Sequence, residues 1–390
     1  MRKILPIIVL SQFLCTTLWF AGNSIIGEIA NELNLSADFL VQVTSAIQFG
    51  FIFGTLFFAI FTIADRFSPS LVFFVSSILA GIFNIGMSIE SFNATELLAL
   101  RFLTGFFLAG IYPVGMKIAS DYFEAGLGKS LGFLVGALVL GTAFPHLLKT
   151  FISNFPWRYV IYVTTALAWL GGLLIFVFVP NGPFRKKGRK IKLNAFLDGF
   201  KIPQFKAAAF GYFGHMWELY TFWAFVPLML KTYTTKYPET TLNIPFWSFS
   251  IIGMGTIACV VAGIFCLKMG TKKLASLALG VSGICCLLSP FFLENSSLLL
   301  FLIFLFVWGF SVVADSPLFS TLVAQSAPPE SRGTSLTLVN SIGFSITIVS
   351  IQFLDYISKY IDTQYLFSFL AIGPALGLWA LFLEKKTMKL

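Results

Sequence analysis

Charged side chains are scarce in this chain. Only 11% of its 390 residues are Asp, Glu, Lys or Arg, whereas a soluble domain carries roughly 25%. Hydrophobic residues make up 57%, and the mean hydropathy is +0.87. Water could not solvate a surface built from this composition, so it excludes a soluble enzyme and predicts a protein covered by lipid.

Motifs for nucleotide, metal and cofactor binding are also lacking. The sequence has no P-loop, no glycine-rich dinucleotide pattern after a strand, and no acid–base pair on a soluble scaffold. Its five cysteines lie within apolar runs without metal-ligand spacing, so we interpret them as small packing residues. We expect no enzymatic activity, no cofactor and no structural metal.

Long apolar runs dominate what is present. A helix needs roughly 20 apolar residues to cross a bilayer core. We predict twelve such helices, at 4–27, 39–63, 70–90, 96–118, 129–151, 157–180, 204–231, 244–267, 273–293, 297–324, 334–356 and 363–383. The runs do not alternate as barrel strands would. The first run continues past twenty residues, so we interpret it as an uncleaved helix rather than a signal peptide.

The two halves of the chain repeat each other at an offset of about 204 residues. Thr17 and Trp19 return as Thr221 and Trp223, and Pro113 returns as Pro317. The segment from Gly128 to Leu131 returns at Gly333 to Leu336. Ordered landmarks in long apolar runs are typical of the parallel repeats of membrane transporters.

Basic residues predict the orientation. With the N-terminus in the cytoplasm, all but six of the 26 Lys and Arg residues fall on the inner side. Eight of them lie in or just after a central segment that opens with Pro180-Asn-Gly-Pro183. We predict a bundle at 1–180, a basic cytoplasmic linker at 181–201 and a second bundle at 202–390. The expected location is a bacterial inner membrane with both termini cytoplasmic. The net charge of +9 indicates contact with anionic lipid, not nucleic acid.

Short motifs agree with this topology. Ala64-Asp65-Arg66-Phe67-Ser68 follows the second apolar run, and a glycine-rich basic segment, 263–273, follows the eighth. The fourth run carries Arg101-Phe-Leu-Thr-Gly105. With six plus six helices and the repeat, the chain resembles the major facilitator superfamily. Its second motif lacks the usual acidic residue, because Leu267 stands there.

The resemblance implies an all-α membrane protein with twelve helices in two six-helix pseudo-repeats. It also implies a cavity lined by the first, fourth, seventh and tenth helices, and alternating access around a small-molecule site near the midplane. Polar residues concentrate on these helices. The expected cavity-lining residues are Thr16, Trp19, Asn23, Arg101, Tyr112, Tyr220, Trp223 and Ser311. We expect the protein to function as a monomer.

Three ionisable residues are the candidates for proton coupling or substrate binding. Glu218 lies near the centre of the seventh run, and His215 precedes it by one turn on the same face. Asp315 lies in the tenth run beside Ser316 and Pro317. A central carboxylate costs about 2.5–3.5 kcal/mol to insert, so each needs a reason to be there. The alternatives are a structural hydrogen bond for Glu218 and a buried pair of Asp315 with His215 or Lys117.

A second hypothesis uses the same three residues differently. His215, Glu218 and Asp315 offer ligand atoms for a divalent metal as the transported solute, although a site without a second histidine or a cysteine is thin. Arg101 has two interpretations as well, a clamp for an anionic group or an organiser of its helix. Trp19 and Trp223 could close over a substrate from opposite sides, or pack within their own halves.

Charged residues at the inner ends of the helices form a further candidate group. We predict that Lys117 and Asp121 join Asp65 and Arg66 in a network that latches an inner gate. His146 and Asn340 are left open as structural residues or flank contacts. The sequence therefore predicts a secondary transporter of a small polar or amphipathic solute, coupled to protons.

Overall fold

The protein is described from a computed structural model. It describes residues 4–35, 39–89, 91–123, 127–152, 155–185, 197–295, 297–328 and 332–387. Within these ranges the regular structure is helical and contains no strand. The chain divides into two compact units, Met1–Lys190 and Ile191–Leu390. The division falls within the expected linker, of which residues 186–196 lie outside the described part.

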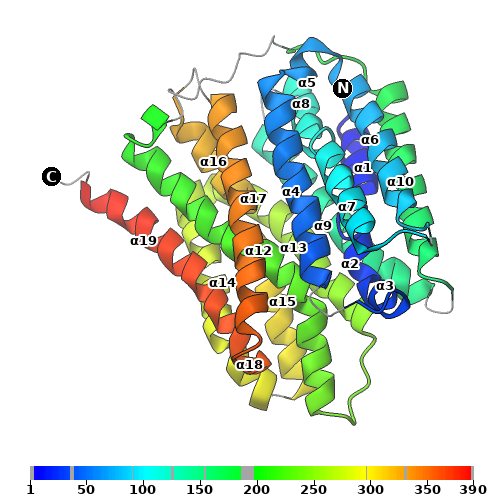
Figure 1. Cartoon of the computed structure of the whole chain (residues 1–390). Coiled ribbons are helices and arrows are strands. Elements are labelled where there is room, and N and C mark those ends of the chain that lie inside the picture. The colour runs from blue at the N-terminus through cyan, green and yellow to red at the C-terminus, as the bar shows by residue number, and fades with distance from the viewer. Residues whose placement is uncertain are drawn as a thin grey trace. The chain divides into compact units, whose positions relative to one another are not determined.

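The described part of the first unit contains ten helices (Figure 1). They are α1 (Ile4–Thr16), α2 (Ala21–Ser24), α3 (Ile26–Glu32), α4 (Phe39–Ile60), α5 (Ile63–Arg66), α6 (Pro69–Gly86), α7 (Ala94–Leu108), α8 (Tyr112–Tyr122), α9 (Leu127–Phe151) and α10 (Arg158–Phe178).

The second unit is built from α12 onward. Its helices are α12 (Pro203–Lys236), α13 (Ile244–Met269), α14 (Thr271–Asn295), α15 (Leu298–Ala314), α16 (Ser316–Ser326), α17 (Arg332–Ile357), α18 (Thr363–Leu366), the 3-10 helix η1 (Phe367–Ala371) and α19 (Ile372–Thr387). In Figure 1, α19 crosses α12 at one edge of this unit.

The same helix pairs pack in both units. In the first unit, α1 packs against α9 and α10, α4 against α7, and α6 against α10. The second unit repeats this pattern: α12 packs against α17 and α19, α13 against α15, and α14 against α19. Each pair occupies corresponding places in its half, so the repeated sequence landmarks reflect a repeated packing scheme.

One helix crossing reproduces the repeat residue by residue. A Cβ on Gly105 of α7 would overlap the carbonyl oxygen of Ile47 on α4. A Cβ on Gly309 of α15 would likewise overlap the carbonyl oxygen of Ile251 on α13. Both partners lie 204 residues after their counterparts. Glycine is required at both crossings because the backbones approach too closely for any side chain.

Both prolines of the repeat mark a helix break. The fourth predicted helix divides into α7 and α8 just before Pro113, and the tenth divides into α15 and α16 just before Pro317. A proline in the first turn of a helix is tolerated because its missing N–H would have no partner there. The break leaves Asp315 between two helical segments, where it caps α15.

Among the residues that the structure describes, ten helical segments are long and apolar enough to cross a membrane. The first and seventh predicted helices are not among them. The helix α1 is apolar but has only 13 residues, and the 34-residue α12 is more polar in composition. The all-helical membrane fold is confirmed, whereas the count of twelve crossings stays a prediction.

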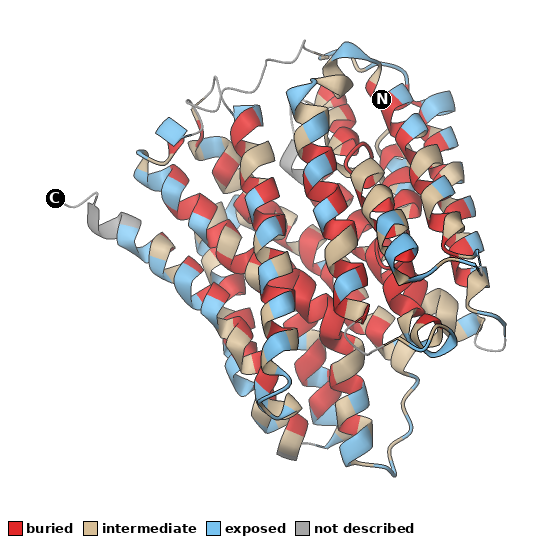
Figure 2. Ribbon diagram, viewed as in Figure 1, coloured by how far each residue is buried: buried red, intermediate tan, exposed pale blue. Residues whose placement is uncertain are grey.

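Burial follows the pattern of a membrane protein (Figure 2). Exposed positions include many large apolar side chains, such as Leu267 at 87% and Leu299 at 68% exposure. Buried positions include polar and charged groups, among them Arg101, Glu218 and Asp315. This distribution is expected where lipid covers the outside and ionisable residues must find partners inside.

Two ion pairs tie the short α3 to neighbouring helices. Glu28 pairs with Lys149 of α9, and Glu32 accepts hydrogen bonds from Trp157 Nε1 at 2.7 Å and Arg158 Nη2 at 2.6 Å. These hydrogen bonds favour the carboxylate and lower the pKa of Glu32 below its ordinary value. The pairs fix the chain after the broken first helix.

Candidate functional site

The side chain of Glu218 lies at the centre of a buried hydrogen-bond network. It is fully buried near the middle of α12. Oε1 accepts from Trp308 Nε1 at 2.6 Å and from Cys286 Sγ at 3.3 Å. Oε2 accepts from Ser282 Oγ at 2.9 Å. The network therefore joins α12 to α14 and α15 within the second unit.

All three donors to Glu218 are neutral, and no ion pair to its carboxylate occurs in the described part of the chain. Neutral donors can hold an ionised carboxylate through directed hydrogen bonds. They also allow the carboxylate to be protonated without leaving a buried cation unpaired. A site of this kind can bind and release one proton.

His215 and Asp315 form a second buried pair. His215 Nδ1 lies 2.8 Å from Asp315 Oδ1, and their side chains are 0% and 1% exposed. None of the four nitrogen and oxygen atoms of these two side chains makes a hydrogen bond of regular geometry among the described residues, so the 2.8 Å approach of Nδ1 to Oδ1 is a close polar contact. The pair carries opposite charges only when the imidazole is protonated. It can therefore hold a second titratable proton or serve as a structural link.

The two pairs lie along one helix–helix contact. His215 and Glu218 are one turn apart on α12, while Trp308 and Asp315 bracket two turns of α15. Since the earlier residue on α12 meets the later one on α15, the helices run antiparallel here. The network has no equivalent in the first half, where Leu14 and Ser11 stand 204 residues before Glu218 and His215.

The metal hypothesis requires His215, Glu218 and Asp315 to meet at one point. No group of three or more His, Cys, Asp or Glu side chains that could hold a metal ion occurs within the described ranges. Glu218 is directed to Trp308, Ser282 and Cys286, while Asp315 is directed to His215. The three residues therefore do not converge on one point.

Cys286 and Ser282 are the members of this network that the sequence analysis missed. The cysteines were interpreted as packing residues, but Cys286 also donates to a buried carboxylate. Both residues lie on α14, whose sequence carries no ionisable group between Lys273 and Glu294 apart from its two cysteines. Their four-residue spacing places both side chains on one face of α14, and this is the sequence feature that indicates a shared partner.

Arg101 links two segments of the first unit through buried hydrogen bonds. Its guanidinium is fully buried, and Nη2 donates to the carbonyl oxygens of Trp19 at 2.6 Å and Leu18 at 3.2 Å. Nη1 donates to Asn84 Oδ1 at 3.3 Å. These acceptors lie on two different segments, residues 17–20 and α6, so the geometry supports the organising role of Arg101.

The arginine explains a difference between the two repeats. Residues 17–20 interrupt the first helix, whereas the corresponding residues around Trp223 continue α12 without interruption. Arg101 takes the carbonyl oxygens of Leu18 and Trp19 out of helical bonding, while Leu305 stands at its counterpart position. The interrupted helix therefore depends on a donor that only the first half carries.

Trp19 and Trp223 are both buried within their own units. The Trp19 ring lies 4.8 Å from Phe51 of α4, and the Trp223 ring lies 5.0 Å from Tyr220 of α12. They are 0% and 1% exposed. These contacts favour packing of each ring within its own half over a lid made by the pair.

The other expected cavity residues also have partners within their units. Thr16 Oγ1 donates to the Gln12 carbonyl at 2.8 Å, and Asn23 Nδ2 donates to Thr44 Oγ1 at 2.6 Å. Ser311 Oγ donates to the Trp308 carbonyl at 3.2 Å. Tyr220 packs on Phe344, and Tyr112 is half-buried at the start of α8.

Gln12 is a further candidate that the predicted site did not include. Its side chain on α1 is fully buried, and neither amide atom has a hydrogen-bond partner among the described residues. A buried amide without partners costs free energy unless a ligand or water satisfies it. The amide of Gln12 is therefore a buried hydrogen-bonding group in the first unit that a ligand or water can satisfy.

A charged network lies where α5 and α8 end. Lys117 Nζ lies 2.7 Å from Asp65 Oδ1 and 3.8 Å from Asp121 Oδ1. Arg66 does not join it, because its Nε donates to Thr62 Oγ1 at 3.2 Å. Adjacent residues on a helix point in different directions, so Asp65 and Arg66 cannot face the same partner.

Arg185, and not the expected Arg66, contacts the segment that carries Asp65. Its Nη2 donates to the carbonyl oxygens of Phe67 at 2.7 Å and Asp65 at 3.1 Å. The segment before it is attached as well, since Tyr122 Oη donates to the Pro180 carbonyl at 2.5 Å and Phe184 N donates to the Asp121 carbonyl at 3.0 Å. The start of the predicted linker is thus part of the network.

His146 and Asn340 are the two residues whose roles the sequence leaves open. His146 is buried beside Pro145 in α9, where its carbonyl accepts from Thr150 Oγ1 at 3.2 Å. Asn340 is half-buried on α17.

Buried ionisable networks inside an all-helical, lipid-covered fold define a membrane transport protein, and comparison with known families gives the class. A sequence model of the Major Facilitator Superfamily matches residues 8–351 and matches again over 208–388. The chain therefore belongs to the major facilitator superfamily. It is an integral membrane protein and a secondary transporter, not an enzyme, and it takes a small-molecule substrate.

A curated relative is consistent with this assignment. The chain is 22% identical over 331 residues to a "Bicyclomycin resistance protein homolog" from Haemophilus influenzae. The match covers 82% of this chain and 80% of the relative. No subfamily follows from an identity this low.

Proposed function

We propose that the protein moves a small polar or amphipathic solute by proton-coupled alternating access, with Glu218 as the proton carrier. The observation that carries the proposal is the network of Glu218, a fully buried carboxylate held only by neutral donors. A carboxylate in a low-dielectric site is retained at a cost of several kcal/mol, which a transport role explains. The adjacent His215–Asp315 pair supplies a second proton site.

The name of the Haemophilus influenzae relative supports export as the direction. Resistance to a compound is gained by removing it from the cell, and a proton entering down its gradient can drive that exchange. We therefore infer an antiporter in a bacterial inner membrane, with both termini in the cytoplasm. The unpartnered amide of Gln12 supplies a polar contact for the solute.

Transport by the purified protein tests the proposal. A thermal-shift screen against metabolites, metals and drugs identifies a ligand, and proteoliposomes then measure its movement with and without an imposed pH gradient. We expect accumulation only when protons can flow in the opposite direction. Accumulation that is equal with and without the gradient would contradict proton coupling, and binding of Mn²⁺ or Zn²⁺ alone would revive the metal hypothesis.

The network of Asp65, Lys117 and Asp121 is proposed as a latch that favours one state of the transport cycle. We expect Asp65→Asn to weaken it by about 1 kcal/mol, which changes a two-state population about fivefold. The labelling rate of a Ser120→Cys reporter by an impermeant maleimide from the cytoplasmic side should then rise. Asp198→Asn is the matched control, because the partner of Asp198 among the described residues is Lys201, three positions away. An unchanged rate in the Asp65 variant would count against the latch.

A further inference from the structure

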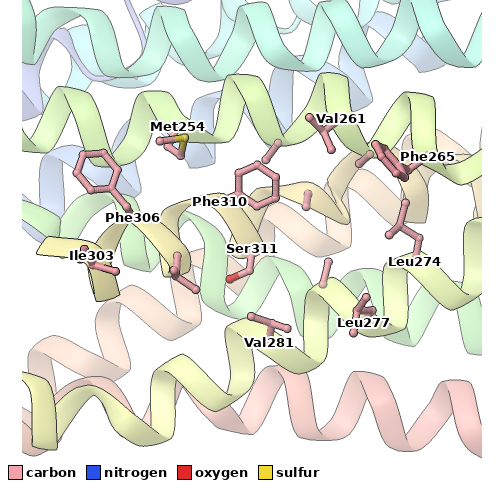
Figure 3. Close-up of a pocket in the computed structure, with 15 residues that line it drawn as sticks. Met254, Val261, Phe265, Leu274, Leu277, Val281, Ile303, Phe306, Phe310 and Ser311 are labelled. Carbon is pink, nitrogen blue, oxygen red and sulfur yellow. The ribbon is translucent and has the colours of Figure 1, made fainter. Parts of the chain in front are cut away.

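An apolar groove of about 600 Å³ lies in the second unit between α13 and α14, with α15 beneath it (Figure 3). Small side chains form its floor, including Ala258, Ala262 and Ala278. Larger ones rise at its edges, where Phe265 is 47% and Leu277 54% exposed. The hollow exists because alanines stand where lipid-facing seams usually carry larger residues.

The lining of the groove is apolar and suits a hydrocarbon occupant. Among the described residues that line it, Ser311 is the single polar one, and its hydroxyl donates to the Trp308 carbonyl at 3.2 Å. No lining side chain is charged. Since a polar group placed there would lose its hydrogen bonds to water, the occupant must be apolar along this length.

The dimensions match one lipid chain. On α13 the lining runs from Met254 to Phe265, which spans roughly 16 Å at the helical rise of 1.5 Å per residue. One leaflet of the hydrocarbon core is about 15 Å thick. A single acyl chain can therefore extend along the groove from the end of the helix to the bilayer midplane.

The groove ends at a basic turn. Phe265 and Leu274 flank the turn between α13 and α14, where Gly270 has a positive φ of 84°. Lys268, Lys272 and Lys273 lie at this turn. The sequence has no acidic residue between Glu239 and Glu294, so the charged side chains between these two positions are all basic. Both helices are candidate membrane spans, which places the lysines at headgroup level.

We propose that this groove is a binding site for an anionic phospholipid. One acyl chain occupies the space over Ala262 and Ala278, and the phosphate lies at Lys268 and Lys273, which are both exposed. Basic residues at helix ends attract anionic headgroups, and the groove adds a fixed place for the chain. Ser311 lies one turn from Trp308, so the bound chain touches the segment of α15 that donates to Glu218.

Native mass spectrometry of the full-length protein in neutral detergent tests this site. The probes are phosphatidylglycerol and phosphatidylcholine with identical acyl chains. We expect the wild type to retain phosphatidylglycerol preferentially. The double variant Lys268→Gln, Lys273→Gln should lower the ratio of bound phosphatidylglycerol to phosphatidylcholine by roughly tenfold or more. The control Lys206→Gln, Lys231→Gln removes exposed lysines from the two ends of α12 and should leave the ratio unchanged.

Filling the groove tests the place of the chain. Ala262→Leu and Ala278→Leu should each reduce binding of both lipids, whereas Ile257→Leu, on the exposed face of α13, should not. Loss of preference in the lysine variant with unchanged binding in both filled variants would indicate surface attraction only and overturn the site. If the filled variants instead lose an apolar cation such as tetraphenylphosphonium while lipid binding persists, the groove belongs to a solute and the proposal is wrong.

Discussion

Glu218→Gln is expected to abolish accumulation driven by a pH gradient while exchange of solute across the membrane continues. The amide keeps the size of the side chain and still accepts hydrogen bonds through its oxygen from Trp308 Nε1 or Ser282 Oγ. It cannot bind and release a proton at physiological pH. The variant therefore separates movement of the solute from its coupling to protons.

The measurement compares two assays on the same proteoliposomes. In counterflow, where no net proton movement is needed, the variant should retain activity within about threefold of wild type, a change of under 1 kcal/mol. In uptake driven by an imposed gradient, it should fall by tenfold or more, roughly 1.4 kcal/mol or above. Glu239→Gln, the same change at an exposed residue, should affect neither assay.

Two results would contradict the assignment. Full gradient-driven accumulation by Glu218→Gln would mean that another group carries the proton. If Asp315→Asn alone abolishes coupling, the His215–Asp315 pair is the carrier and the Glu218 network is structural. A melting temperature equal to wild type keeps the first comparison interpretable, because loss of folding would remove both activities together.

The sequence predicted the position of Glu218 but not its partners. A carboxylate inside an apolar run is visible because its insertion cost requires an explanation. Ser282 and Cys286 are small residues in an ordinary apolar helix, and nothing in their spacing identifies the helix that they face. Contacts between segments 64 to 90 residues apart depend on how the helices pack, which one sequence does not reveal.

The repeat predicted more of the fold than any single motif. The breaks before Pro113 and Pro317 follow from proline chemistry, so they could be expected from the sequence. The interruption after Thr16 could not, because Thr17 and Trp19 repeat at Thr221 and Trp223, where the helix is continuous. The cause lies 83 residues away from Leu18, in a buried arginine whose counterpart is a leucine.

The residues that join the charged network near the linker could not be predicted from the sequence either. Arg66 was expected in the charged network because it follows Asp65, yet its side chain bonds Thr62. Arg185 was counted only as one of several basic linker residues, but it donates to the loop after α5. Charge patterning predicted that a network would form at this end of the unit, while its membership was decided by side-chain direction.

Arg101→Leu is expected to destabilise the first unit strongly. The variant gives the first repeat the leucine that stands at the equivalent position of the second repeat, Leu305. The change removes the donors to Trp19 O, Leu18 O and Asn84 Oδ1 from a fully buried position. Each buried acceptor left without a partner costs about 1–3 kcal/mol, so we expect a total loss of roughly 3–5 kcal/mol.

Thermal unfolding of purified protein in detergent measures this loss, and size-exclusion profiles measure the folded fraction where yield is low. A change of this size corresponds to a fall in melting temperature of about 10 °C. Arg101→Lys should give a smaller fall, because one ammonium group cannot reach all three acceptors. Arg158→Leu is the comparison: Arg158 is only partly buried, pairs with the exposed Glu32 and donates to the Ser88 carbonyl at 3.3 Å, so the loss should be smaller, about 1–2 kcal/mol.

The three variants distinguish the two interpretations of Arg101. If Arg101 organises the fold, Arg158→Leu should lose the least stability, Arg101→Lys more and Arg101→Leu the most. Solute binding should then decline only as far as the folded fraction declines. A clamp for an anionic solute predicts instead that Arg101→Leu keeps its melting temperature and loses solute binding. The reason is that an arginine held for ligand binding contributes little to the stability of the empty protein. If Arg101→Leu melts at the wild-type temperature but no longer binds solute, its contacts with Leu18 and Trp19 do not hold the interrupted helix, and the organising role is wrong.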